Sequence, residues 1–456
     1  MTLETPIRPT PTTPAVEPTA KPAAPPATAP TDTLLQRRSH VRGLRCRACG
    51  EPQAIGPSFI CPACFGPLEI EYDYDVARSA LTPEAIAGRA PGIWRYLELL
   101  PVERAPERGL AVGSTALVRA DRLARDLGLG TGTTLHLKDD TRNPTLSFKD
   151  RVVAVATARA VEFGFDTLAC ASTGNLAGAT AAAAAAAGLR AFVFVPADLE
   201  PAKVEHALSY GATVVRVEGT YDEINRLSLE IADEEGWAFV NVNLRPFYAE
   251  GSKSIAFEVA EQLGWRLPDV LVGPIASGSM FTKIAKGFDE LVDIGLVEPK
   301  VVRFVGGQPE GCAPVATAFA EGVDEIRPVR TPDTIVRSLA IGSPADGGGA
   351  LELARRTGGS IESVPDDVTA SAIRRTAATE GVFVETAGGV TVGAVEAARA
   401  RGVIRDGDEV VAVLSGNGVK TPDARRFALG DEGAGTDGLG APIEPTYSAF
   451  ATAFGS

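Results

Sequence analysis

The sequence predicts an α/β protein in which parallel sheets are flanked by helices. From about residue 133 onward, short apolar runs such as TTLHLKDD, TLACAS and AFVFVP alternate with longer helical stretches. The composition agrees, because 45% of the 456 residues are apolar, only 6% are aromatic, and 48 are glycines suited to the connecting loops. Strands that alternate with helices in this way form parallel sheets covered by helices on both faces.

The same alternation gives the order of the elements. The apolar runs predict strands at 133–140, 167–172, 191–196, 213–219, 269–274, 301–307 and 409–414. Helices are expected over Phe148–Gly164, from Asn175, from Pro201 to about residue 212, up to about Gly236, and over 278–295. A short amphipathic helix is expected within 92–102.

The two ends of the chain differ from this central part. Residues 1–31 are rich in Pro, Thr and Ala, and predict a disordered arm without the hydrophobic core of a signal peptide. Residues 430–456 form a Gly-rich tail that we expect to be mobile. The longest apolar run, Ala177–Leu189, is shorter than the roughly 20 residues that a membrane span needs. We therefore expect a cytoplasmic protein that does not enter a membrane.

The net charge of −14 makes nucleic acid an improbable partner, while a small anionic substrate stays compatible with it. The three histidines, His40, His136 and His206, lie in no metalloprotease or hydrolase motif. His136, in a predicted strand, and His206, in a predicted helix, are interpreted as packing or surface residues.

Four cysteines within 40–75 predict a zinc-ribbon-like segment. Cys46, Cys49, Cys61 and Cys64 form two CxxC pairs, the spacing of a four-thiolate tetrahedral site. The gap between the pairs is shorter than usual, so metal-free CxxC turns stay the alternative. In either case the ribbon does not explain the function.

Four loops after predicted strands carry unusual residues. Lys149, in NPTLSFKDR, opens a helix with Ser147 as its expected N-cap, and the helix dipole there disfavours a positive charge and lowers the lysine pKa. This suits a lysine that attacks a carbonyl, although the stretch alone is compatible with an ordinary solvated lysine. In STGNLAGAT, Ser172, Thr173 and Asn175 place polar groups at a helix N-terminus, where a carboxylate is favoured.

The other two loops are rich in glycine and serine. GPIASGSM leaves backbone amides uncovered at a helix start, as a phosphate cradle requires, without matching a nucleotide-binding motif. In LSGNGVK, Ser415 places a hydroxyl at a strand end. A lysine, a carboxylate site, a phosphate cradle and a hydroxyl together match the aldehyde, phosphate and ring nitrogen of pyridoxal phosphate (PLP) and an amino-acid substrate.

These motifs resemble the threonine synthase family, within the tryptophan-synthase-β-like fold type II of PLP enzymes. The resemblance rests on NPTLSFKDR, STGNLAGA, NVNLRPFYAEGSKS, GPIASGSM, FVETAGGVTVG and LSGNGVK, which occur in family order between about His40 and Arg425. It implies a two-subdomain catalytic domain over 76–429, with a smaller subdomain at roughly 145–245 inserted in the larger. It also implies a homodimer.

The resemblance also implies roles for individual residues. Lys149 would bind the cofactor aldehyde, Asn175 its ring hydroxyl and Ser415 its pyridine nitrogen. The cofactor phosphate would be held by Ile275, Ala276, Ser277, Gly278 and Ser279. The substrate carboxylate would be bound by Ser172 and Thr173, and the substrate phosphate by Arg245 and Lys253, with Asn241, Asn243 and Ser252 as neutral donors. The implied reaction converts O-phospho-L-homoserine and water to L-threonine and phosphate.

Two residues depart from the family pattern. Leu146 stands where His, Gly or another small or polar residue is expected, and Ser415 replaces the usual threonine. The alternatives are therefore a paralogue, such as a cysteine or cysteate synthase or a serine/threonine dehydratase, and a non-catalytic zinc-ribbon binding protein. The motifs PIASGS and STGNLAG lack the features of dehydratases, and the presence of Lys149 and Asn175 argues against loss of catalysis.

Overall fold

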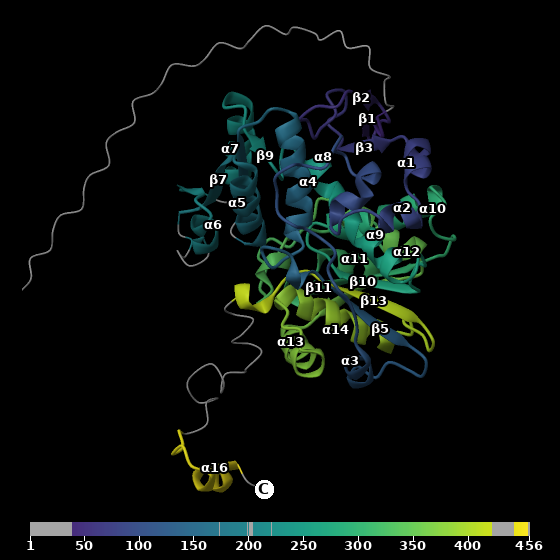
Figure 1. The fold of residues 1–456 in the computed structure, drawn as a ribbon, viewed down its shortest axis with the longest axis vertical. Coiled ribbons are helices and arrows are strands. Elements are labelled where there is room, and N and C mark those ends of the chain that lie inside the picture. Colours follow the sequence, from purple (N-terminus) through teal and green to yellow (C-terminus); the bar gives the residue numbers. More distant parts are fainter. Residues whose placement is uncertain are drawn as a thin grey trace, which may run out of the picture. The chain divides into compact units, whose positions relative to one another are not determined.

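A computed structural model describes residues 39–421, except 173, 198, 200–203 and 220, and residues 442–454. The strands of this described part form three sheets, one of six strands, one of four and one of three (Figure 1). The predicted arm at 1–31 lies outside the described residues. No helix in the described ranges is long and apolar enough to cross a membrane.

The six-stranded sheet is parallel apart from its edge strand β4, as the apolar runs predicted. Its spatial order is β12 (Ser360–Val364), β11 (Arg303–Pro309), β10 (Val270–Pro274), β13 (Glu409–Leu414), β5 (Thr134–Asp139) and β4 (Leu117–Arg119). Strands β10 and β13 are neighbours, so the loops that follow them leave the same edge of the sheet.

The four-stranded sheet is parallel throughout and takes all its strands from the interval of the predicted smaller subdomain. Its order is β8 (Thr213–Val217), β7 (Arg190–Pro196), β6 (Thr167–Ala171) and β9 (Ala238–Phe239). The three-stranded sheet is antiparallel and consists of β2 (Pro52–Gln53), β1 (Val41–Cys46) and β3 (Leu68–Tyr72).

Helices cover the two parallel sheets (Figure 1). The α-helices of the described residues are α1 (Tyr74–Ala80), α2 (Pro83–Ala87), α3 (Asp121–Asp126), α4 (Lys149–Glu162), α5 (Asn175–Ala187), α6 (Glu205–Ser209), α7 (Tyr221–Glu234), α8 (Arg245–Glu250), α9 (Lys253–Gln262), α10 (Ser279–Asp293), α11 (Pro314–Glu321), α12 (Gly347–Arg356), α13 (Asp366–Glu380), α14 (Thr386–Ala400) and, apart from the sheets, α16 (Tyr447–Phe454). The alanines of α5 let it pack closely, and at Gly178 an added Cβ would lie 2.2 Å from the ring of His206. His206 is therefore a packing residue, as predicted.

One local prediction differs from the structure, and two others, the helix from Pro201 and the tail at 430–456, fall partly outside the described residues. The helix expected within 92–102 is a 3₁₀ helix, Ile93–Leu99, with a kink at Tyr96, because Tyr96 and Leu99 are both drawn into the core. The helix expected from Pro201 begins at Glu205 in the described part, and Pro201 itself lies outside it. Part of the tail forms α16, whose apolar residues the glycine content of the tail concealed.

A buried ion cluster fixes the start of α4. The Arg151 guanidinium, fully buried, donates to Asp140 at 2.6 Å and to Glu258 of α9 at 2.7 Å. Lys138 of β5 donates to the same Glu258 at 2.6 Å. Because each buried charge is paired, the cluster avoids the large penalty of an uncompensated charge. It joins β5, α4 and α9 two residues after Lys149, and so holds the position of that lysine.

Candidate active site

Lys149 is the first residue of α4, and its Nζ donates a hydrogen bond to the Tyr248 hydroxyl of α8 at 2.9 Å. The same Nζ lies 4.7 Å from the centre of the Phe148 ring. Ser147 is not the helix N-cap. Instead, the Asp150 carboxylate reaches back to accept from the Thr145 N–H and hydroxyl, both at 2.7 Å. The lysine amine is thus held by aromatic neighbours and a phenol, and no carboxylate of the described chain forms a hydrogen bond with it.

The loop before Lys149 pairs with the loop after β13. The Phe148 N–H donates to the Ser415 carbonyl at 2.9 Å, and the Asn417 N–H donates to the Leu146 carbonyl at 3.0 Å. Leu146 has a φ of +63°, in the left-handed region that favours glycine or a polar residue. The expectation of a small or polar residue at this position therefore has a backbone reason, and a leucine here is strained. The pairing brings Ser415 next to the start of α4.

A buried carboxylate joins Asn175 and Ser415. Asn175, the first residue of α5, donates through Nδ2 to Glu385 Oε2 at 2.9 Å, and Ser415 Oγ donates to Glu385 Oε1 at 3.2 Å. Glu385 precedes α14, and its own N–H donates to the Gly416 carbonyl at 3.0 Å. Burial raises the pKa of the Glu385 carboxyl. Two residues predicted to contact the cofactor ring, far apart in the sequence, therefore meet at one acidic group.

The predicted phosphate loop, 275–279, connects β10 to the start of α10. Gly278 has a φ of +94°, and a Cβ there would lie 2.6 Å from the Asp346 carbonyl oxygen, so only glycine fits. The helix has no side-chain cap, and the Asp346 N–H donates to the Ser277 carbonyl at 2.8 Å. An uncapped helix start next to a glycine turn presents backbone N–H groups to an anion.

Of the residues predicted to bind the substrate phosphate, some have side chains free to bind a ligand and others do not. Arg245 begins α8, has 42% of its side chain exposed, and donates to Asp346 at 3.1 Å. Residues three apart share a helix face, so Arg245 lies on the face of α8 that carries Tyr248. The Oδ1 atom of Asn241 is buried and accepts no hydrogen bond in the described structure. These two residues retain groups that a ligand could bind.

Lys253 and Asn243 do not reach this site. Lys253 is fully buried, with Nζ 2.6 Å from Glu250 and 2.8 Å from Glu290, so its charge is already paired inside the core. Asn243 uses both ends of its amide on the backbone, accepting from the Phe239 N–H and donating to the Trp237 carbonyl. Ser252 is also buried, directly before α9. We therefore correct the sequence prediction and remove Lys253 and Asn243 from the phosphate-binding set.

The two residues predicted to bind the substrate carboxylate lie before α5. The Ser172 hydroxyl accepts from the Gly174 N–H at 3.3 Å, and Thr173 lies outside the described residues. An added Cβ at Gly174 would meet nothing within 4 Å, so the approach to this helix start is open.

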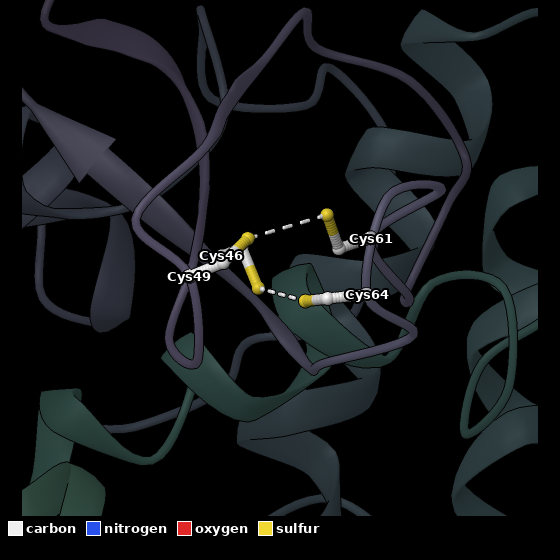
Figure 2. Close-up of side chains that lie close together, drawn as sticks. All are labelled: Cys46, Cys49, Cys61 and Cys64. Atoms are coloured by element: carbon white, nitrogen blue, oxygen red, sulfur yellow. Dashed lines mark hydrogen bonds between the residues drawn. The ribbon is translucent and has the colours of Figure 1, made fainter.

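The four cysteines of the ribbon converge, as predicted (Figure 2). All four Sγ atoms lie within 4.8 Å of one another, with Cys46 and Cys64 at 3.4 Å and Cys49 and Cys61 at 3.8 Å. Four sulfurs at tetrahedral zinc distances would lie about 3.8 Å apart. A backbone hydrogen bond from Cys49 lowers the pKa of Cys46 to about 6. For Cys49, a backbone hydrogen bond from Glu51 lowers the pKa, but hydrogen bonds with Cys64 and Cys46 outweigh it and raise the pKa to about 12. Without a metal, Cys46 is therefore the favoured thiolate of this pair.

Sequence reasoning missed three residues of this site. Tyr248 and Glu385 both lie inside motifs that carried the family resemblance, but neither residue stood out from its neighbours. Only their contacts with Lys149 and Asn175 identify them. Asp346 lies in a stretch with no motif, and no sequence signal could have found it.

Comparison with known proteins gives a consistent result. A sequence profile of the family described as "Pyridoxal-phosphate dependent enzyme" matches residues 109–416. The threonine synthase of Methanocaldococcus jannaschii is 34% identical over 382 residues, covering 83% of this chain and 93% of that protein. The threonine synthase of Methanosarcina acetivorans is 35% identical over 381 residues, covering 83% and 92%.

Solved structures share the fold at lower identity. Threonine deaminase isoform 2 from Solanum lycopersicum superimposes with a TM-score of 0.57 at 21% identity, covering 69% of this chain and 83% of that one. Maize serine racemase superimposes with a TM-score of 0.55 at 19% identity, covering 67% and 89%.

Proposed function

The chain belongs to the pyridoxal-phosphate dependent enzymes and, among them, to the threonine synthases, and we propose that it converts O-phospho-L-homoserine and water to L-threonine and phosphate. It is a PLP-dependent lyase that acts on a small-molecule substrate. The roles of its residues rest on one observation, that side chains from three distant loops come together. Lys149 contacts Tyr248, and Asn175 and Ser415 both contact Glu385. A cytoplasmic homodimer is the assembly that we expect.

The residues present fit the cofactor. Lys149 offers an amine whose hydrogen-bond partner in the described structure is a phenol, not a carboxylate. Asn175 and Ser415 offer an amide and a hydroxyl around one buried acid, and the 275–279 loop offers an uncapped helix start. Ser147 Oγ, two residues before Lys149, is buried without a hydrogen-bond partner in the described structure, as expected for a group that a bound ligand would satisfy. When bound, PLP supplies an electron-withdrawing ring that makes the protons on nearby substrate carbons removable.

Lys149 and Tyr248 are the groups that we assign to proton movement. The lysine Nζ can accept a proton from the substrate Cα and return one at a neighbouring carbon, because it begins a helix held rigid by Arg151. The Tyr248 hydroxyl at 2.9 Å positions that amine and can exchange a proton with it. Both groups lie within hydrogen-bond distance of each other, which general acid–base transfer requires.

The substrate anions need positive or N–H-rich surroundings. Ser172 and the first N–H groups of α5 are suited to the α-carboxylate, because the helix N-terminus favours an anion. Arg245 is suited to the phosphate, since its planar fork can bind two oxygens at once and stabilise the leaving group. The bond between Cγ and the phosphate oxygen breaks and phosphate leaves. Cβ gives up one proton, Cγ gains one to become the methyl group, and water supplies the hydroxyl at Cβ and a proton that balances the charge of the released phosphate.

The cysteine cluster is suited to a structural zinc ion. All four positions are filled by protein sulfurs, so no coordination position stays open for a reacting water, as in structural rather than catalytic zinc sites.

The direct test is turnover of O-phospho-L-homoserine by the PLP-loaded protein, followed by phosphate release and amino-acid analysis. We expect phosphate and L-threonine in equal amounts. Ammonia and a 2-oxo acid from L-serine or L-threonine, with O-phospho-L-homoserine untouched, would instead identify a dehydratase of the same fold. A protein that binds PLP and acts on neither would point to a β-replacement paralogue, with Leu146 the first residue to exchange.

A further inference from the structure

The cysteine ribbon contributes an arginine to the edge of the proposed active site. Arg47 lies between Cys46 and Ala48 in the first CxxC turn, and its Nη1 donates to Asp346 Oδ1 at 3.3 Å. The other oxygen of the same carboxylate accepts from Arg245 at 3.1 Å. Two arginines from distant segments, 299 and 101 residues from Asp346, thus share one acid.

The location of this acid connects the pair to the phosphate loop. The Asp346 N–H donates to the Ser277 carbonyl, and its own carbonyl packs against Gly278. Arg245 lies on the helix face of Tyr248, whose hydroxyl contacts Lys149. The two guanidinium groups therefore lie between the ribbon and the loops that carry the chemistry.

The charge balance favours an anion. Arg47 also lies 3.6 Å from Glu69, so the described ion-pair network around it is counted as a whole. The cations Arg47, Arg245, Lys253, Lys283 and Lys286 exceed the carboxylates Asp346, Glu69, Glu250 and Glu290 by one charge, in a chain whose net charge is −14. Both side chains are partly open, with exposed fractions of 44% for Arg47 and 42% for Arg245. Each guanidinium has five N–H donors, and each uses one in its hydrogen bond to Asp346 within the described structure. A guanidinium fork can bind a carboxylate or a phosphate through two oxygens. A phosphate has a third free oxygen, so two arginines can bind it together.

We propose that Arg47 is a specificity-determining residue that, together with Arg245, binds the phosphate group of the substrate. The proposal rests on the proposed function for the identity of that substrate. The ribbon then has a second purpose beyond stability, because its metal-binding turn holds one of the two phosphate-binding arginines. A purely structural Arg47–Asp346 strut between ribbon and core is the competing explanation.

The test uses the full chain loaded with PLP and metal, and compares Arg47→Ala with Arg45→Ala. Arg45 is the matched control, because it lies two residues before Arg47 at the end of β1, pairs with Glu71 at 2.8 Å and has 49% of its side chain exposed, and it contacts no residue of the site among those described. Binding of inorganic phosphate is measured by titration calorimetry, which needs no turnover. L-threonine, which carries no phosphate, is titrated in parallel.

We expect Arg47→Ala to weaken phosphate binding about tenfold or more, since a charge-assisted hydrogen bond is lost. KM for O-phospho-L-homoserine should rise by a similar factor with kcat changed less than about threefold, because uniform binding is removed. L-threonine affinity and the Arg45→Ala variant should match wild type. If Arg47→Ala loses its metal, Arg47→Gln, which keeps the stem, carries the same comparison.

Equal phosphate affinity of Arg47→Ala and Arg45→Ala would overturn the proposal. Arg47 would then have only a structural role, through its contact with Asp346. Parallel loss of phosphate and L-threonine binding in Arg47→Ala would do the same, because that pattern reflects general damage to the site. A wild type that makes no L-threonine would refute the proposed function instead, while the phosphate titrations would still decide the role of Arg47.

Discussion

Lys149 and Lys253 occupy the same local position, each the first residue of a helix, yet their surroundings are opposite. At the start of α4, the Lys149 amine meets a phenol and an aromatic ring. At the start of α9, the Lys253 amine is enclosed by Glu250, Glu290 and the ring of Tyr72, whose centre is 4.0 Å away. The first amine is available for chemistry, whereas the second neutralises buried acids.

The difference teaches that a lysine at a helix start has no fixed role. The dipole acts on both amines in the same sense, but it is weak compared with two carboxylates at hydrogen-bond distance in a dry core. Lys283 and Lys286 also reach Glu250, so the Lys253 region joins β3 of the ribbon to α8, α9 and α10. The predictions that follow test the contrast between these two helix starts.

The largest effect is expected for Lys149→Ala. Removal of the amine should lower kcat/KM for O-phospho-L-homoserine by about a thousandfold or more, because the proton-moving group is lost. Phosphate release measures the loss. The urea unfolding midpoint should change little, since the amine forms no ion pair at hydrogen-bond distance in the described structure and acts on buried Glu385 only through a minor Coulomb attraction. Substantial phosphate release from the variant would contradict the role of Lys149.

Lys253→Met should leave the mechanism intact and damage the fold. The change removes the ion-pair partner of buried Glu290, while Glu250 keeps Lys283 and Lys286. Removing one partner of a buried pair costs about 3–5 kcal/mol of unfolding free energy. Urea unfolding measures this cost. Lys300→Met, which removes a 39% exposed lysine paired with Asp269, is the control and should cost less than about 1 kcal/mol. If Lys253→Met were as stable as wild type but had a raised KM for O-phospho-L-homoserine, Lys253 would instead be a phosphate-binding residue.

Tyr248→Phe isolates the hydroxyl that faces Lys149. We expect kcat to fall about a hundredfold, because the amine loses the partner that positions it and exchanges its proton. The pH–rate profile should shift as well, which a merely structural tyrosine would not cause. Tyr74→Phe removes a comparable hydroxyl from Glu290, outside the site, and should leave kcat near the wild-type value. Equal kcat values for the two variants would exclude a catalytic role for Tyr248.

Glu69→Gln should have the smallest effect, and it should depend on pH. Burial raises the pKa of Glu69, but Lys283 and Lys286 more than offset this and lower it to about 2. Because the pKa of Glu69 is lower in the folded protein than its ordinary value of 4.5, its ionised carboxylate stabilises the fold at any pH above about 4.5. This stabilisation is lost as the pH falls from 4.5 toward 2. Near neutral pH, the Glu69→Gln variant should have an unfolding free energy about 1 kcal/mol lower than wild type, because the ion pairs of Glu69 with Lys283 and Lys286 are partly exposed. In strong acid the two proteins should be equally stable. Urea unfolding at several pH values measures the difference, and a pH-independent loss would contradict the assignment.

Much of the fold could be predicted because its signals are local. The apolar runs at 167–172 and 269–274 correspond to β6 and β10, and the cysteine spacing predicted the four-sulfur cluster. The site was predictable only in part. Asn243 looked like a polar donor in a functional motif, but its amide serves the turn before α8. Nothing in the composition of a motif distinguishes a side chain that faces a ligand from one that faces the backbone.

The sequence by itself determined the α/β class, the strand order along the chain, the ribbon cysteines, and the set of loops that bear the chemistry. These follow from periodicity, spacing and turn residues, which act over a few positions. The tertiary structure decided which residues meet. Tyr248 reaches Lys149 across 99 residues, Glu385 reaches Asn175 across 210, and Asp346 reaches Arg47 across 299. Such contacts depend on how sheets and helices pack against one another, and no local pattern in the chain records that packing.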